Sequence, residues 1–391
     1  MSLLHCSLTR RDERVEGNDI SGPRDEILGP LAGVMQSDGG SWHFDEKSSD
    51  RLWHKSAIGI PVQGGGISLT SVEMMFCINH RNIESPGISF LFGGLEDDPA
   101  LFNEYAVMEA LRTPGNKIVL GCNLGKLGIG HSKRSWGLRW ESDKHPSKDP
   151  AVSEVRWFTA EQEFDVDDLY EWVREVEDSG RIAESIVVDE EMSVVTYRLS
   201  IADPRGNLTP PSIEEFLIIS DNEYAETMNG GAYFPGADDW PLEAVGIPVQ
   251  GGRQLDWAER ELVHFFGKSS KNNNIEDFST GPTNPHLGMT KTASLLHELW
   301  NRGLNTRSGF KFGTTWRCYS GSVGQDHAPW LINDPEDYHK TIGVWSKACL
   351  TSRLASGVNK HWICPVDVGT GEWRFLRVSR PPADSRWSNP R

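Results

Sequence analysis

One short block of this sequence occurs twice. Residues 57–65 read AIGIPVQGG and residues 244–252 read AVGIPVQGG, which is an offset of 187 positions. Three further matches follow at an offset of 188: Glu73 with Glu261, 111–115 with 299–303, and 121–125 with 309–313. Four matches at nearly one offset predict a tandem duplication of a unit of roughly 190 residues.

Each copy is predicted to contain a small N-terminal part and a larger module. Helical patterns occur at 71–79 and 257–266, at 102–111 and 290–300, and at 165–176 and 337–353. Strand patterns occur at 151–158 and 328–332, and a terminal hairpin is expected at 185–201 and 362–379. Helices that alternate with strands and end in a hairpin predict an α/β (α+β) fold with mixed sheets.

The turn residues suggest where these parts begin and end. Gly115 and Gly303 each follow an amphipathic helix, as a helix C-cap glycine would. A stretch rich in Pro and Gly after residue 202 is typical of a linker. The predicted boundaries are a leader at 1–28, N-terminal-type domains at 29–98 and 217–283, mixed-sheet domains at 99–203 and 284–391, and a linker at 204–216.

Composition excludes several classes of protein. The sequence has 15 tryptophans and is 37% hydrophobic, which is enough for globular cores. It has no apolar run long enough for a transmembrane helix, and its first residues lack a signal-peptide pattern. The six cysteines show no CxxC or paired spacing, so we expect reduced thiols, no zinc site and a cytoplasmic protein.

The charge is unevenly distributed. The net charge is −17, but residues 301–391 contain 13 Lys and Arg against 7 Asp and Glu, which gives that segment +6 and leaves −23 for the rest. An acidic body with a basic C-terminal end could bind a polyanion through that end. It could equally bind a second copy of itself, acidic surface to basic surface.

A basic and aromatic segment at 131–148 is longer than the corresponding turn of the second copy. Interleaved cations and aromatic rings suit contact with an RNA backbone and base stacking, with Lys144 and Lys148 as candidate RNA contacts. The alternative is an ordinary surface loop whose tryptophans pack on the domain.

Three residues of the second copy form a candidate catalytic set: Tyr319, His327 and Lys360. A phenol, an imidazole and an ammonium together can perform acid–base chemistry on a phosphate without a metal. By spacing, the first copy has His131, Asp149 or Pro150, and Ile182 at these positions. We therefore interpret the first copy as a scaffold and the second as the active copy. Taken singly, each residue could be an ordinary strand-end tyrosine, turn histidine or solvated lysine.

The second copy resembles the catalytic unit of the archaeal tRNA-splicing endonucleases. The resemblance rests on the helix ending at Gly303, the turn GFKFG at 309–313, Tyr319, the stretch HAPWLI at 327–332, the helix end SRL at 352–354, and Asn-Lys at 359–360. It covers nearly the whole chain from about residue 50. It implies the fused form of the family, in which a structural and a catalytic unit share one chain and two chains pair.

The resemblance also implies an activity. The expected reaction is metal-independent cleavage of precursor tRNA at bulge-helix-bulge exon–intron junctions, without a cofactor, leaving a 2′,3′-cyclic phosphate and a 5′-hydroxyl. Tyr319 would be the general base, His327 the general acid, and Lys360 the group that stabilises charge on phosphorus. Because the nucleophile is a 2′-hydroxyl, RNA is the expected partner and DNA is not.

Further residues follow from the resemblance. Arg353 matches the family's arginine that stacks on a bulge base, and Arg377 or Arg380 would supply a second cation. The acidic turn of Asp189, Glu190 and Glu191 matches the loop that docks into the facing chain of a homodimer, although it could be only a solvated turn. Two rival functions remain: a non-catalytic RNA-binding or structural subunit, and a metal-dependent nuclease.

Overall fold

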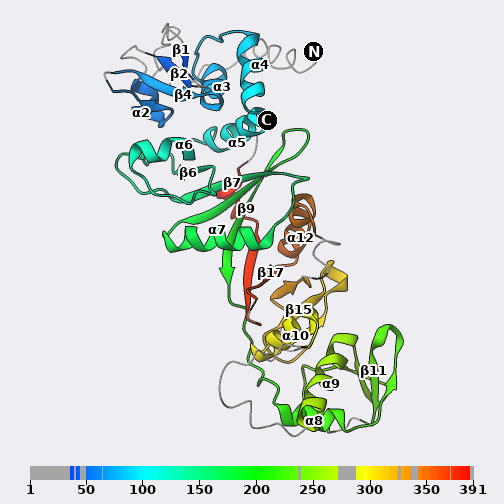
Figure 1. Cartoon of the computed structure of the whole chain (residues 1–391). Coiled ribbons are helices and arrows are strands. Elements are labelled where there is room, and N and C mark those ends of the chain that lie inside the picture. Colours follow the sequence, from blue (N-terminus) through cyan, green and yellow to red (C-terminus); the bar gives the residue numbers. More distant parts are fainter. Residues whose placement is uncertain are drawn as a thin grey trace, which may run out of the picture.

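The computed structural model describes residues 36–38, 41–44, 50–63, 65–236, 239–271, 288–324, 327–334, 336, 342–369 and 371–387. The predicted leader at 1–28 lies outside these residues. The chain forms an elongated molecule. The N-terminal part of each half lies at one end, and one large sheet, to which both halves contribute, lies between them (Figure 1). Within the described residues, no helix is both long and apolar enough to cross a membrane.

The central feature is a mixed sheet of ten strands in the order β14-β15-β16-β17-β18-β9-β8-β7-β6-β5. Each half contributes five consecutive strands, and the last strands of the two halves, β9 and β18, pair antiparallel at the centre. The order of strands is therefore the same outward from the centre in both halves. The strands are β5 (Lys117–Leu120), β6 (Gly137–Trp140), β7 (Ser153–Thr159), β8 (Ile182–Val188), β9 (Val194–Ala202), β14 (Asn305–Ser308), β15 (Trp316–Tyr319), β16 (Trp330–Ile332), β17 (His361–Asp367) and β18 (Trp373–Ser379).

Each half also has a smaller N-terminal part with a four-stranded sheet. The first contains β1 (Gln36–Asp38), β2 (Ser41–Phe44), α2 (Asp50–Ser56), β3 (Ile60–Pro61), β4 (Ile67–Thr70), α3 (Ser71–His80) and α4 (Ile88–Asp97). The second contains α8 (Ile213–Ser220), β10 (Ala225–Glu226), β11 (Ala232–Pro235), β12 (Ile247–Val249), β13 (Gly252–Leu255) and α9 (Trp257–Lys271). The prediction of mixed α/β architecture is confirmed.

Helices cover both faces of the large sheet. On one face, α5 (Leu101–Arg112) packs in the first half and α10 (Lys291–Asn301) in the second. On the other face, α7 (Val166–Asp178) and α12 (Trp345–Gly357) share one core with strands of both halves. Helix α7 contacts β17 of the second half as well as its own β8 and β9. The two halves are therefore joined by side-chain packing as well as by strand pairing.

The predicted helices and hairpins are largely confirmed, and their ends follow known capping rules. Asp165 caps α7 by accepting hydrogen bonds from the backbone of Asp167 and Asp168. Gly303 takes a left-handed φ of +74° directly after α10, as a C-cap glycine does. The helix predicted at 337–353 is wrong at its start, because residues 342–344 form a turn and an isolated bridge and α12 begins at Trp345. Positions 337–341 lie outside the described residues.

A buried glutamate shows which residues of the two N-terminal parts correspond. Glu73 accepts a 2.9 Å hydrogen bond from the backbone of Gly59, and Glu259 accepts a 2.9 Å bond from that of Gly246. The counterpart of Glu73 is therefore Glu259, and the predicted match with Glu261 is wrong by two residues. Glu261 instead binds Thr290 at the start of α10.

The segment predicted as a linker at 204–216 is largely fixed in place. Its end was predicted too late, because α8 begins at Ile213 with Ser212 as its cap. Gly206 donates to the backbone oxygen of Arg302, and Leu208 donates to that of Gly303. The backbones approach so closely that a Cβ on Gly206 would lie 2.1 Å from the Gly303 oxygen.

We therefore expect Gly206→Ala to destabilise the protein by about 1–3 kcal/mol, because the added methyl group must push two backbones apart. Thermal unfolding followed by circular dichroism should show a melting temperature lower by several degrees. The matched control is Gly321→Ala, where a Cβ would meet nothing within 4 Å. Equal melting temperatures for the two variants would contradict this account of the segment.

Candidate active site

The three predicted catalytic residues lie at neighbouring strand ends in the second half of the large sheet. Tyr319 ends β15, Lys360 precedes β17, and His327 lies three residues before β16. Strand β16 runs antiparallel to β15 and parallel to β17. The end of β15 and the starts of β16 and β17 therefore lie side by side. The strand register brings together residues that are 41 positions apart in the sequence.

Strand alternation puts these side chains on the face covered by α12. In β15, Trp316 and Cys318 pack in the core under α10, so Tyr319 points to the other face. In β17, Trp362 packs in the core under α12. Lys360 lies two residues before Trp362, so its side chain points to the same face of the sheet. Tyr319 is 9% exposed, Lys360 is half-buried and His327 is exposed. A ligand can reach the imidazole directly from solvent.

The contacts of Lys360 fix its ammonium next to His327. Its Nζ donates to the backbone oxygen of Ala328, the residue that follows His327. The same Nζ lies 5.4 Å from the ring centroid of Phe312 in the preceding 3₁₀ turn, Phe310–Phe312. The ammonium is thus held between the turn before β15 and the entry to β16.

Arg317 connects Lys360 with Tyr319, and the sequence interpretation missed it. Its guanidinium carbon lies 5.7 Å from the centroid of the Tyr319 ring. Burial lowers the pKa of Lys360 from 10.5, and the positive charge of Arg317 lowers it further. The alternation of Arg317 and Tyr319 within the stretch WRCY could have revealed that the two share a face. The site therefore gathers two cations, a phenol and an imidazole, which suits a substrate with concentrated negative charge.

The strand register identifies the counterparts of these residues in the first half. Tyr319 pairs with Asn305 as Trp140 pairs with Lys117, so Trp140 replaces the tyrosine and the expected His131 is wrong. Ser153 of β7 and Trp330 of β16 occupy equivalent positions in the strand pairing. Pro150 and His327 each lie three residues earlier, so Pro150 is the counterpart of His327. Arg181, not Ile182, replaces Lys360, because Ile182 and His361 are the paired first residues of β8 and β17.

The cation of the first half is retained but neutralised. Arg181 forms a 2.8 Å ion pair with Glu154, which is 1% exposed. In the second half the residue at the place of Glu154 is Leu331, so Lys360 has no such carboxylate. The two halves differ in the charge available to a ligand as well as in the phenol and the imidazole.

The 131–148 segment is mostly built into the first half. Trp140 is 1% exposed, and Trp136 donates a 2.8 Å hydrogen bond to Glu104. Arg139 forms a buried double hydrogen bond with Glu184. For the tryptophans the alternative of packing on the domain is therefore correct. Lys144 and Lys148 are exposed in a turn, and their contact with RNA stays a prediction.

The predicted RNA-binding arginines of the second half lie on different faces of the sheet. Arg353 is exposed on α12. Burial raises the pKa of the Tyr197 phenol, and the charges of Arg353 and Arg380 both oppose that rise, so these two arginines share a neighbour. Arg377 alternates with Leu376 and Val378, which pack under α12, and so it points to the opposite face. The geometry therefore pairs Arg380, rather than Arg377, with Arg353.

The acidic turn of the first half is exposed between β8 and β9. Asp189 accepts hydrogen bonds from the backbone of Glu191 and Ser193, which fixes the turn. The side chains of Asp189, Glu190 and Glu191 are all exposed. A rigid turn with three carboxylates is available for a basic partner surface.

Comparison with known proteins agrees with this site. Residues 291–373 match the family described as tRNA intron endonuclease, catalytic C-terminal domain. A tRNA-splicing endonuclease of Methanosarcina barkeri is 23% identical over 351 residues, which cover 86% of this chain and 96% of that protein. A tRNA-splicing endonuclease of Methanosarcina mazei is 26% identical over 60% of this chain and 68% of its own length. One from Methanococcoides burtonii is 19% identical over 82% of this chain and 91% of its own length. The chain is therefore a homologue of archaeal tRNA-splicing endonucleases over most of its length, and it carries their catalytic domain at residues 291–373.

Proposed function

We propose that this tRNA-splicing endonuclease cuts precursor tRNA at bulge-helix-bulge exon–intron junctions by attack of a 2′-hydroxyl on the adjacent phosphate. The observation that carries the proposal is the position of Tyr319, His327 and Lys360 at neighbouring strand ends inside the matched domain. The products are a 2′,3′-cyclic phosphate and a 5′-hydroxyl. No metal ion is needed for this reaction, because side chains perform both proton transfers.

Each residue has a distinct role in the proposed reaction. Tyr319 takes the proton of the 2′-hydroxyl, and His327 gives a proton to the departing 5′-oxygen. Lys360 stabilises the extra negative charge on the pentacoordinate phosphorus. Arg317, close to both Tyr319 and Lys360, adds a second positive charge near the phosphate.

The first half acts as a structural unit that arose by duplication of the same ancestral unit. Equal strand order, equal register and the equivalent Glu73 and Glu259 caps support this proposal. The unit boundaries then fall at 29–98 and 99–203 in the first copy and, with α8 and its cap included, at 212–283 and 284–391 in the second. On the substrate, Arg353 and Arg380 contact the bulge, and Lys144 and Lys148 of the first copy reach the flanking RNA.

We also propose a homodimer that carries two active sites. Helix α12 and its C-cap residue present an apolar stripe of Leu350, Leu354 and Val358, exposed by 52%, 51% and 45%. Residues at i, i+4 and i+8 form one face of a helix, which a partner surface would cover. The acidic turn of Asp189, Glu190 and Glu191 supplies a complementary charge to the basic segment 301–391 of the facing chain.

A non-catalytic subunit is the main rival function, and a direct assay decides between the two. Purified protein with excess EDTA should cut a bulge-helix-bulge RNA and leave cyclic phosphate ends. His327→Ala and Tyr319→Phe should each slow single-turnover cleavage by about 100- to 10,000-fold. Lys360→Ala should slow it by about 100- to 1,000-fold. Phe in place of Tyr319 retains the ring beside Arg317 and removes only the hydroxyl.

Two exposed residues provide controls for that assay. His54→Ala in α2 and Lys347→Ala in α12 remove the same side-chain types outside the site and should leave the rate unchanged. Uncut RNA with the wild-type protein would favour the non-catalytic rival. Loss of cleavage in EDTA would instead favour a metal-dependent nuclease.

The lowered pKa of Lys360 predicts a pH effect. The charged ammonium is the active form, and a lowered pKa means that it loses its proton at a lower pH than an ordinary lysine. Single-turnover cleavage should therefore decline on the alkaline side below pH 10.5. Arg317→Gln removes the repulsion, so the decline should move to higher pH, whereas Arg374→Gln should not move it. If the rate of Arg317→Gln declines at the same pH as that of the wild type, a group other than Lys360 causes the alkaline decline.

The dimer is tested by light scattering. The wild-type protein should have twice the 43.7 kDa mass of one chain. Replacing Asp189, Glu190 and Glu191 together by Lys should shift the population toward the monomer, because the complementary charge is reversed. As the control, Glu171, Asp178 and Glu223, which lie outside the turn, are replaced together by Lys. A wild-type mass of one chain would refute the dimer.

A further inference from the structure

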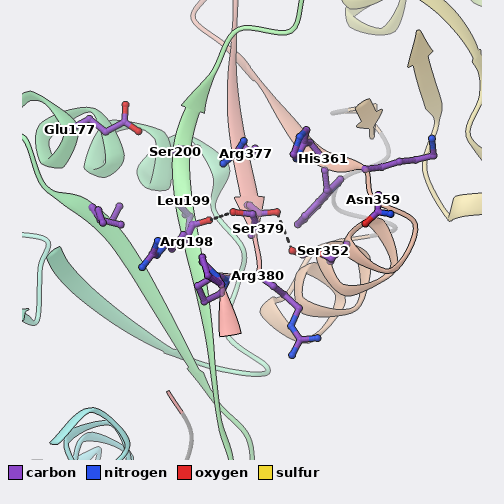
Figure 2. A pocket seen from close by; sticks show the side chains of 18 of the residues that line it. Glu177, Arg198, Leu199, Ser200, Ser352, Asn359, His361, Arg377, Ser379 and Arg380 are labelled. Atoms are coloured by element: carbon purple, nitrogen blue, oxygen red, sulfur yellow. Dashed lines mark hydrogen bonds between the residues drawn. The ribbon is translucent and has the colours of Figure 1, made fainter. Parts of the chain in front are cut away.

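A cavity of about 610 Å³ lies at the junction of the two halves, where β9 pairs with β18 (Figure 2). Fourteen of its lining residues form seven pairs, each with one member from either half and a separation of 179 positions. The pairs include Arg198 with Arg377, Ser200 with Ser379, and Arg181 with Lys360. The cavity therefore straddles the axis that relates the two halves.

Arg198 and Arg377 lie diagonally across this axis. Arg377 is opposite Ser200, and Ser379 is opposite Arg198, in the pairing of β18 with β9. Residues two places apart on paired strands leave the sheet on the same face and within reach of each other. Arg198 and Arg377 are thus diagonal neighbours on one face of the sheet, with a serine opposite each, and both line the cavity; Figure 2 shows all four residues around the two strands.

The charge in the cavity is strongly unbalanced. Its lining has five Lys or Arg residues (Arg181, Arg198, Lys360, Arg377 and Arg380) and one acidic residue, Glu177. Arg181 is already neutralised by Glu154, which leaves four cations against Glu177. Within the described residues, Arg377 and Arg380 form no ion pair, and Arg198 is 3.8 Å from Glu184, whose carboxylate already holds Arg139. Two arginines together without matching carboxylates repel each other unless an anion lies between them.

Both arginines also have unused hydrogen-bond donors. The Nε atoms of Arg198 and Arg377 are covered, yet neither donates a hydrogen bond within the described structure. A covered donor without an acceptor is unfavourable, and a phosphate oxygen would satisfy it. Planar guanidinium groups bind phosphate with two parallel hydrogen bonds.

The cavity is connected with the catalytic site through β17. His361 lines the cavity, and so does its neighbour Lys360, a residue of the proposed catalytic set. Burial and the charge of Arg377 both lower the pKa of His361, so this ring adds a neutral donor at the rim. An RNA chain that passes the strand end at Lys360 can therefore place a second phosphate in the cavity.

We propose that the cavity at the β9–β18 junction binds a phosphodiester of the substrate RNA away from the cut, held jointly by Arg198 of the first half and Arg377 of the second. This inference rests on the proposed function and adds a substrate contact from the half that lacks the catalytic residues. The first half is then a part of the RNA-binding surface as well as a scaffold.

The test measures binding of a bulge-helix-bulge RNA over a range of NaCl concentrations. Arg198→Gln should weaken binding and reduce the slope of log K against log [NaCl] by about one, because one phosphate contact is lost. Single-turnover cleavage at saturating protein should be unchanged, since the triad is intact. Arg198→Lys keeps the charge and should retain most of the slope. Arg374→Gln, on the same strand but paired with Glu372, is the matched control and should behave as wild type.

A second variant does not depend on losing an arginine. Ser200→Asp places a carboxylate opposite Arg377 and should also weaken binding, whereas Ser200→Asn should not. If Arg198→Gln and Ser200→Asp both bind RNA with the wild-type affinity and slope, the inference is wrong. If, in addition, inorganic phosphate raises the melting temperature of wild type but not of Arg198→Gln, the cavity binds a free anion, and the RNA contact is equally refuted. A wild-type protein that does not cut the RNA would instead refute the proposed function.

Discussion

The pairing of β9 with β18 is the interaction on which the rest of the structure depends. Five residue pairs, from Phe375 with Ala202 to Ser379 with Arg198, join two five-stranded sheets into one. Without this pairing each half would expose an unpaired edge strand, which is prone to aggregation. The pairing also lets α7 of the first half pack on β17 of the second. Loss of either half would therefore expose strand and core of the other.

This shared sheet explains how one fold supports two different halves. Glu154 and Glu184 of the first half stand where Leu331 and Ile363 stand in the second. In the first half the carboxylates are buried and hold Arg181 and Arg139, which makes a stable but neutral interior. In the second half apolar residues leave Lys360 unneutralised. A buried carboxylate at either place would compete with a phosphate for the nearby cations, so the apolar residues are as important to the site as the cations.

Much of this could be predicted from the sequence, because helical periodicity and long hairpins are local patterns. The correspondence between the two halves was harder to predict. Eleven residues separate Gly125 from β6, but only two separate Gly313 from β15. Counting along the chain therefore paired Tyr319 with His131, whereas hydrogen-bond register pairs it with Trp140. Arg317 was overlooked because a four-residue strand gives only a weak periodic pattern, although the alternation of Arg317 with Tyr319 is present in the sequence.

The sheet also explains how an acidic protein can hold RNA. Consecutive residues of a strand point to opposite faces, so Lys360 and His361 at the start of β17 lie on different faces of the sheet. Lys360 turns to the face of α12, where Arg353 and Arg380 also lie, and His361 turns with Arg377 to the other face. Cations are thus gathered on both sides of one strand end. A local excess of positive charge, not the net charge of the chain, decides where a polyanion binds.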